Sequence, residues 1–167
     1  MSELIKKISS YNIFNFLFPG ILFVYLTKIL FSINLLQDNI FIGVFLYYFI
    51  GLVISRVGSL VIEPVLKIFN LLKFADYSDY IKASKKDSML ELFSEVNNMY
   101  RTLSSLFVCI FIFWLYLFLS RYYNLCKSTN KIIMLLTFMS LFVYSYIKQS
   151  NYITKRIHTA ISKKGKH

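Results

Sequence analysis

Residues that build metal centres and disulfide frameworks are scarce in this sequence. It holds two cysteines, Cys109 and Cys126, and two histidines, His158 and His167, among 167 residues. Two cysteines cannot make a disulfide scaffold, and no group of Cys, His and carboxylate residues has the spacing of a metal site. We therefore expect no bound metal and no disulfide between Cys109 and Cys126.

Motifs of the common catalytic sites are also missing. The sequence has no glycine-rich phosphate loop and no nucleophile motif of the GxSxG kind. Arg156 and His158 lie too close together to match the wider Arg–His spacing of a nuclease signature. The sequence therefore predicts no catalytic residue and no cofactor, and we expect that the protein is not an enzyme.

Acidic residues are few, because 8 Asp and Glu stand against 19 Lys and Arg, for a net charge of +11. Apolar side chains are abundant, at 57% of the residues and a mean hydropathy of +0.58. Since these side chains fall in long runs, the composition indicates a membrane protein rather than a soluble one. The first run follows Lys6 and Lys7, extends past Ile33 and lacks a small-residue cleavage site, so we interpret it as a retained span.

The fold class that we predict is all-α, a polytopic membrane protein forming a single domain over residues 1–167. Four transmembrane helices are expected, at about residues 11–33, 40–56, 102–120 and 132–148. Ser88 and Glu91 have the spacing of a capping box, so the third helix is expected to begin well before its span. Extensions of helices 2 and 3 would then form a short cytoplasmic helical stalk, with the stalk and its loop covering residues 56–101 and a basic tail covering residues 149–167.

The orientation is predicted from the positions of the Lys and Arg residues. Only four of the 19 fall on the side of the two outer turns, namely Lys28, Arg121, Lys127 and Lys131. Because Lys and Arg gather in cytoplasmic segments, the central loop and both termini are expected in the cytoplasm.

The stretch from Ile40 to Leu72 holds two sets of residues that we single out. Gly51, Ser55, Gly58 and Ser59 recur at helical spacing, and such a small-residue surface lets another backbone approach closely. It either packs inside the bundle, against the first or third span, or faces a second copy in a homo-oligomer.

The second set is a charge network of Arg56, Glu63, Glu95 and Arg101. Antiparallel stalk helices would bring Arg56 level with Arg101, and Glu63 roughly level with Glu95. Two cations and two carboxylates close to the membrane would neutralise one another, whereas each alone would be costly there. The network either fixes the register of the stalk or takes part in gating or partner recognition.

The basic tail after Ile147 has six positive charges and no acidic residue: Lys148, Lys155, Arg156, Lys163, Lys164 and Lys166. Such a segment attracts anionic lipid headgroups and also nucleic-acid phosphates. Membrane lipid is the expected partner because the tail is already tethered at the membrane, and direct nucleic-acid binding is the alternative.

Several segments together resemble a group of small four-span accessory membrane proteins encoded in bacterial antiphage defence loci, including RADAR-type and type VI CRISPR loci. These segments are YNIFNFLFPGILFVYL, GLVISRVGSLVIEPVLK, FADYSDYIKASKKD and SEVNNMYRTLSSLF, within residues 11–107. The resemblance implies an inner-membrane accessory or effector role, which modulates or localises a nucleic-acid-acting defence complex or perturbs the membrane on infection. A cytoplasmic defence complex would then be a partner. The alternatives are a small oligomeric channel or transporter, or a membrane scaffold.

Overall fold

The computed structural model describes residues 11–124 and 126–162, and this part of the chain is helical with no β-strand. The all-α prediction is therefore confirmed for the described residues. In chain order the elements are η1 (Ile13–Leu17), α2 (Phe18–Phe31), α3 (Ile40–Val57), η2 (Gly58–Ile62), α4 (Glu63–Ile68), α5 (Tyr77–Ser84), α6 (Met89–Tyr122) and α7 (Lys127–Ser162).

Four helical stretches are long and apolar enough to cross a membrane, as the sequence predicts. They are Ile13–Phe31, Ile40–Ile68, Met89–Tyr122 and Ser128–Thr159. At 1.5 Å per residue the 34 residues of α6 and the 36 of α7 each extend for about 50 Å. This length exceeds a hydrocarbon core of about 30 Å.

Each proline of the chain follows a widened helical turn. The π-helical segments η1 and η2 end just before Phe18-Pro19 and Glu63-Pro64, where the Phe18 N–H bonds to the Ile13 carbonyl and the Glu63 N–H to the Gly58 carbonyl. A proline has no N–H to donate, and its ring crowds the carbonyl four residues before it. The wider turn accommodates the ring while the helix continues. Both prolines are therefore accommodated by π-helical turns without a break in the helix.

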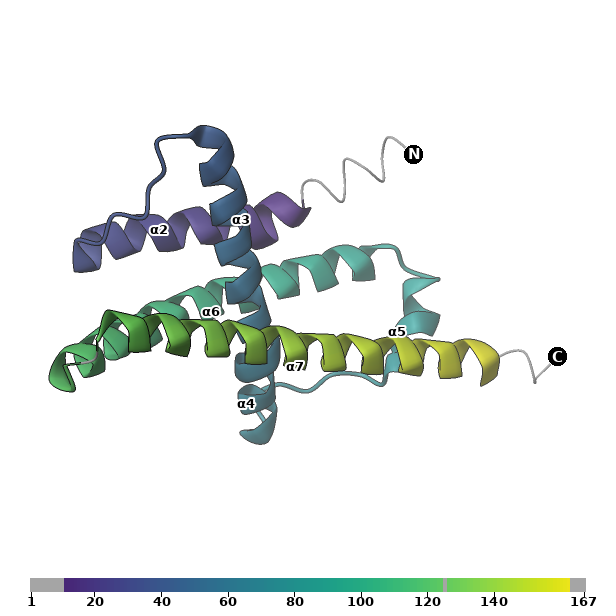
Figure 1. The fold of residues 1–167 in the computed structure, drawn as a ribbon. Coiled ribbons are helices and arrows are strands. Elements are labelled where there is room, and N and C mark those ends of the chain that lie inside the picture. Colours follow the sequence, from purple (N-terminus) through teal and green to yellow (C-terminus); the bar gives the residue numbers. More distant parts are fainter. Residues whose placement is uncertain (1–10, 125, 163–167) are drawn as a thin grey trace.

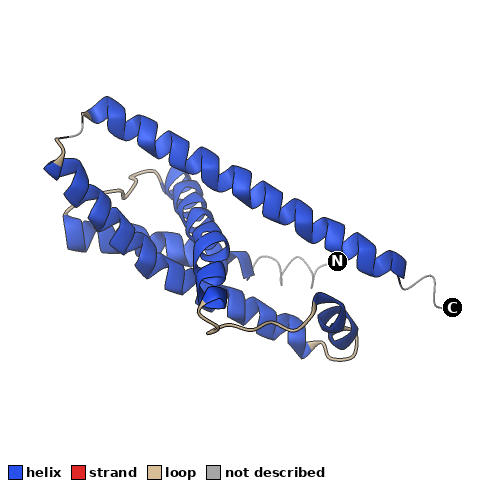
Figure 2. Cartoon of the chain, turned by 90° about the horizontal axis from the view of Figure 1, so that it is seen from below, coloured by secondary structure: helices blue, strands red, loops and turns tan. Residues whose placement is uncertain are grey.

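The continuous helix formed by α3, η2 and α4 lies across the other long helices and contacts α2, α6 and α7 (Figure 1). Seen from below, α7 is separated from α6, while α2 and α6 lie together (Figure 2). The Phe49 ring of α3 meets the Phe138 and Phe142 rings of α7, with both centroid distances at 6.0 Å. Apart from the hydrogen bonds between Ser120 of α6 and Asn130 of α7 beside their turn, the crossing helix is what holds α7 to the rest of the described structure.

Helix ends place the connecting segments at opposite ends of the molecule. The helix α5, the first turns of α6 and the last turns of α7 lie at one end, and the α6–α7 turn lies at the other (Figures 1 and 2).

The cap at the start of α6 differs from the predicted capping box. The Ser88 side chain makes no capping hydrogen bond, and the Asp87 carboxylate instead accepts from the Met89 N–H at 2.9 Å.

At the start of α7 the Cys126 sulfur takes the capping position and accepts the Thr129 N–H at 3.4 Å. The hydrogen bond between the Cys126 sulfur and the Thr129 hydroxyl also lowers the pKa of the exposed Cys126 thiol below its ordinary value. Cys109 and Cys126 are both free, so no disulfide joins them.

The apolar residues are distributed as in a protein that is surrounded by lipid. Among the described residues, the buried large apolar side chains are only Val24, Ile54, Leu106 and Ile110, of which Val24 and Leu106 are fully inaccessible. Large apolar side chains such as Phe41 and Phe45, each about three-quarters exposed, cover the outer faces. An apolar exterior of this extent is typical of a membrane protein.

Candidate functional site: a charge cluster at the helix crossing

The backbones of the first two apolar helices touch where they cross. A Cβ atom added to Gly51 would lie 1.7 Å from the Phe16 carbonyl oxygen, and one added to Gly20 would lie 1.8 Å from the Tyr47 carbonyl oxygen. Contact at this distance requires glycine on both helices. The sequence identified Gly51 as a packing position but missed Gly20, which occupies the matching position on α2.

All four residues of the predicted small-residue surface, Gly51, Ser55, Gly58 and Ser59, are buried within the single chain. A Cβ atom at Gly58 would lie 2.3 Å from the Ser105 hydroxyl of α6. Ser59 contributes its backbone carbonyl as an acceptor for the Lys148 ammonium group of α7. Of the two alternatives left open by the sequence, the structure shows packing inside the bundle.

A buried polar group fixes the contact of α6 with the first two helices. The Thr102 hydroxyl lies 2.9 Å from the Asn15 side-chain oxygen, 3.3 Å from the Ser55 hydroxyl and 2.9 Å from the Asn98 carbonyl oxygen. Asn15, Ser55 and Thr102 are each at most 5% exposed. Sequence reasoning missed this polar triad, although an asparagine within an apolar run is a readable signal of an interhelical hydrogen bond.

Next to the polar triad, the Glu63 carboxylate is surrounded by three cations. Its Oε2 lies 3.2 Å from the Arg101 guanidinium of α6, and its Oε1 lies 3.0 Å from the Lys67 Nζ of α4 and 3.6 Å from the Lys148 Nζ of α7. The Glu63 side chain is only 7% exposed. We call Glu63, Lys67, Arg101 and Lys148 the Glu63 cluster.

The Glu63 cluster overlaps only in part with the predicted charge network. Glu63 and Arg101 are brought together, but Arg56 and Glu95 make no ion pair with any described residue. Both instead lie close enough to Tyr11 to interact with it electrostatically, as Arg101 also does. The predicted pairing of all four charged residues in one network was therefore wrong.

The difference arises from the angle between the helices. The predicted match in height near Arg56 and Arg101 agrees with the contact between their neighbours Ser55 and Thr102. Because the crossing helix runs across α6 instead of alongside it (Figure 1), the chain after Ser59 does not follow α6 back toward Glu95. The Glu63 side chain consequently meets Arg101, close to the crossing point.

Two cations of the Glu63 cluster were not singled out in the sequence. Lys67 follows Glu63 by four residues, a spacing that places both on one helix face and could have been recognised. Lys148 lies 89 residues after Ser59, its other contact, and no local pattern indicates that pairing. The cluster joins α4, α6 and α7 by electrostatic contacts that a purely apolar crossing would not provide.

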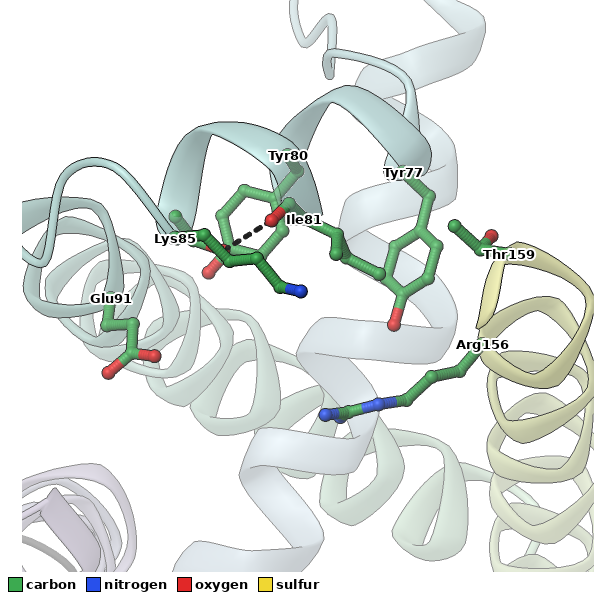
Figure 3. Close-up of a pocket in the computed structure, with 8 residues that line it drawn as sticks. Tyr77, Tyr80, Ile81, Lys85, Glu91, Arg156 and Thr159 are labelled. Carbon is green, nitrogen blue, oxygen red and sulfur yellow. Dashed lines mark hydrogen bonds between the residues drawn. The ribbon is translucent and has the colours of Figure 1, made fainter. Parts of the chain in front are cut away.

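A pocket of about 670 Å³ lies between α5, α6 and α7, away from the Glu63 cluster. Tyr77 and Tyr80 of α5 line it together with Lys85 and with Arg156 of α7. The ends of the Lys85 and Arg156 side chains point into the space between α5 and α7 (Figure 3). This pocket combines aromatic and cationic side chains at the end of the molecule where α5 lies.

Within residues 11–124 and 126–162, no group of three or more His, Cys, Asp or Glu residues is placed to hold a metal ion. The Glu63 cluster contains one carboxylate and three cations, a composition that suits anions and not metal ions.

The chain matches no known family model, no curated protein and no solved structure.

Proposed function

We propose that this chain is a non-enzymatic accessory or effector membrane protein of a bacterial antiphage defence system. It would modulate or localise a nucleic-acid-acting complex, or perturb the membrane on infection. The resemblance of segments within residues 11–107 supports the antiphage setting. The observation that supports action through the membrane domain is the Glu63 cluster, in which one buried carboxylate holds three helices together.

The contacts of α7 suggest how such a protein would respond to a partner. The most apolar stretch of α7 has none of its residues buried inside the chain. Its contacts to the crossing helix are the Phe49 ring contacts and the bonds from Lys148 to Glu63 and Ser59. An element with so few buried contacts can move at low cost in free energy. A complex that binds near Arg156, about two helical turns beyond Lys148, would act directly on α7 and thereby on the Lys148–Glu63 ion pair.

The proposed location is the bacterial inner membrane with both termini and the central loop in the cytoplasm. The charge asymmetry of the sequence supports this orientation. The positions of α5 and of the last turns of α7 at the same end of the molecule are consistent with it. In this arrangement α5, the first turns of α6 and the last turns of α7 would form the cytoplasmic part of the structure.

Cysteine labelling tests the orientation. In a background without Cys109 and Cys126, single cysteines replace Ser88, before α6, and Ser128, at the start of α7; both positions are exposed. A membrane-impermeant maleimide added to cells with a permeabilised outer membrane should label position 128 and should label position 88 only after lysis. Labelling of position 88 in cells with an intact inner membrane would contradict the proposed orientation.

Phage challenge tests the function. Deleting the chain from its bacterial host should increase plaque formation by at least one phage of a broad panel, and wild-type chain should restore protection. Lys148→Gln should restore it less well, because α7 loses its ionic contact with Glu63, whereas Lys82→Gln on the exposed surface of α5 should restore it fully. Membrane amounts of the variants are matched by immunoblot, and a membrane-potential dye distinguishes a membrane effect from recruitment of a complex. If deletion changes plaque formation for no phage, the proposed role is wrong.

A further inference from the structure

The Glu63 cluster has more positive than negative charge. One carboxylate faces three cations, which leaves a surplus of two positive charges among the described residues of the cluster. Arg56 and Glu95, which interact with Tyr11 as Arg101 does, carry opposite charges that sum to zero, so they do not change this surplus. Cations held close together between helices require a counter-charge when water is scarce.

The surplus charge is accessible from outside the chain. The side chains of Lys67, Arg101 and Lys148 are 45%, 24% and 23% exposed, while Glu63 is 7% exposed. The carboxylate therefore lies beneath the three cations, whose outer surfaces are open to an approaching anion. The Lys67 ammonium group also lies 4.5 Å from the centre of the Phe74 ring, so an aromatic side chain borders the same surface.

Arg101 retains unused hydrogen-bonding capacity. One of its guanidinium N–H groups binds Glu63 at 3.2 Å, and its Nε atom is buried without any hydrogen-bond partner. A buried donor that is left unpaired is unfavourable, and an arginine fork binds phosphate oxygens through two donors at once. A small turn of the side chain on binding an anion would give these donors a partner.

From these observations we infer that Lys67, Arg101 and Lys148 form a binding site for a phosphate group, supplied by the headgroup of an anionic phospholipid. A phosphate provides the missing negative charge and several acceptor oxygens for three separate donors. The exposed apolar side chains of Val61 and Val65 lie on either side of Glu63 in the sequence, so a bound headgroup can keep its acyl chains in the bilayer. This site is distinct from the basic tail and does not depend on the proposed role in defence.

Lipid titration tests the site. The purified full-length chain is placed in nanodiscs of phosphatidylcholine with increasing phosphatidylglycerol, and bound lipid is measured by native mass spectrometry after gentle release. The wild type should bind phosphatidylglycerol in preference to phosphatidylcholine. Lys67→Gln should weaken that binding about fivefold, the effect of about one lysine near a membrane surface. Lys82→Gln removes the same charge from an exposed lysine of α5 and should leave the affinity unchanged.

Lys67 is the most exposed of the three cations, and its loss leaves Glu63 paired with Arg101 and Lys148, so this variant should fold. Lys148→Gln provides a second variant. The headgroup preference is measured on the wild type, so this part of the test does not depend on whether a variant folds.

A parallel series adds inorganic phosphate to phosphatidylcholine nanodiscs and measures thermal stability. Stabilisation by phosphate that Lys67→Gln abolishes, without any headgroup preference, would assign the site to free phosphate. The inference fails if the wild type shows no headgroup preference and no response to phosphate, or if neither variant alters them.

Discussion

Replacing Gly51 by alanine should destabilise the folded chain more than any other single-methyl addition to α3. The new Cβ atom would lie 1.7 Å from the Phe16 carbonyl oxygen and 2.6 Å from its carbonyl carbon, and both are backbone atoms that cannot rotate away. The two helices would have to separate by on the order of 1 Å, which would also disturb the Gly20 contact with Tyr47. We expect a loss of about 3 kcal/mol in the free energy of unfolding, the upper end for overpacking.

The matched control for this variant is Gly43→Ala on the same helix. Its Cβ atom would lie 3.2 Å from a ring carbon of Tyr47, a side chain that can shift slightly. Alanine also favours the helix over glycine by about 1 kcal/mol, so this variant should be close to neutral. Unfolding by SDS titration in mixed micelles gives both free energies. Equal stabilities of Gly51→Ala and Gly43→Ala would show that the two helices do not touch at Gly51.

Replacing Glu63 by glutamine should also cause a large loss of stability. Glutamine keeps the shape of the side chain but removes the only negative charge among Lys67, Arg101 and Lys148. Removing one partner of a buried ion pair costs about 3–5 kcal/mol, and we expect about 3 kcal/mol because the three cations are partly exposed to solvent. The contact of α7 should weaken most, since Lys148 would be repelled by the remaining cations.

Asp79→Asn removes an exposed carboxylate instead of a buried one and serves as the control. Asp79 pairs with Lys82 at 3.0 Å, but their side chains are 63% and 61% exposed, and such a pair contributes at most about 1 kcal/mol. Thermal unfolding in detergent compares the two variants. In the doubly substituted chain, Lys148→Gln should recover part of the stability that Glu63→Gln loses, because it reduces the uncompensated charge. A Glu63→Gln variant as stable as Asp79→Asn would exclude a structural role for the cluster.

Much of the local structure was predictable because it depends on chain composition and helical periodicity. Long apolar runs separated by short polar turns identify four helices that can cross a membrane, and the absence of any breaker between Ser88 and Tyr122 predicts the single helix α6. Gly51 and Gly58 were recognised as sites of close approach from their spacing alone. These features require only knowledge of which residues share a helix face.

The partners across helices depend on the tertiary structure. Helical spacing gives the face on which Glu63, Arg101 and Lys148 lie, but not the angle at which the helices cross. Antiparallel helices would pair Glu63 with the region of Glu95, whereas the crossing seen in Figure 1 brings it to Arg101 and Lys148.

The sequence by itself determined an all-helical chain with four apolar helices, because hydropathy and periodicity act over short distances along the chain. Only the tertiary structure decided that Asn15 meets Thr102 and that three cations surround Glu63. These contacts join residues far apart in sequence, and their geometry follows from how closely two backbones approach. That approach is fixed at Gly20 and Gly51, where the carbonyl groups of one helix lie against the glycines of the other.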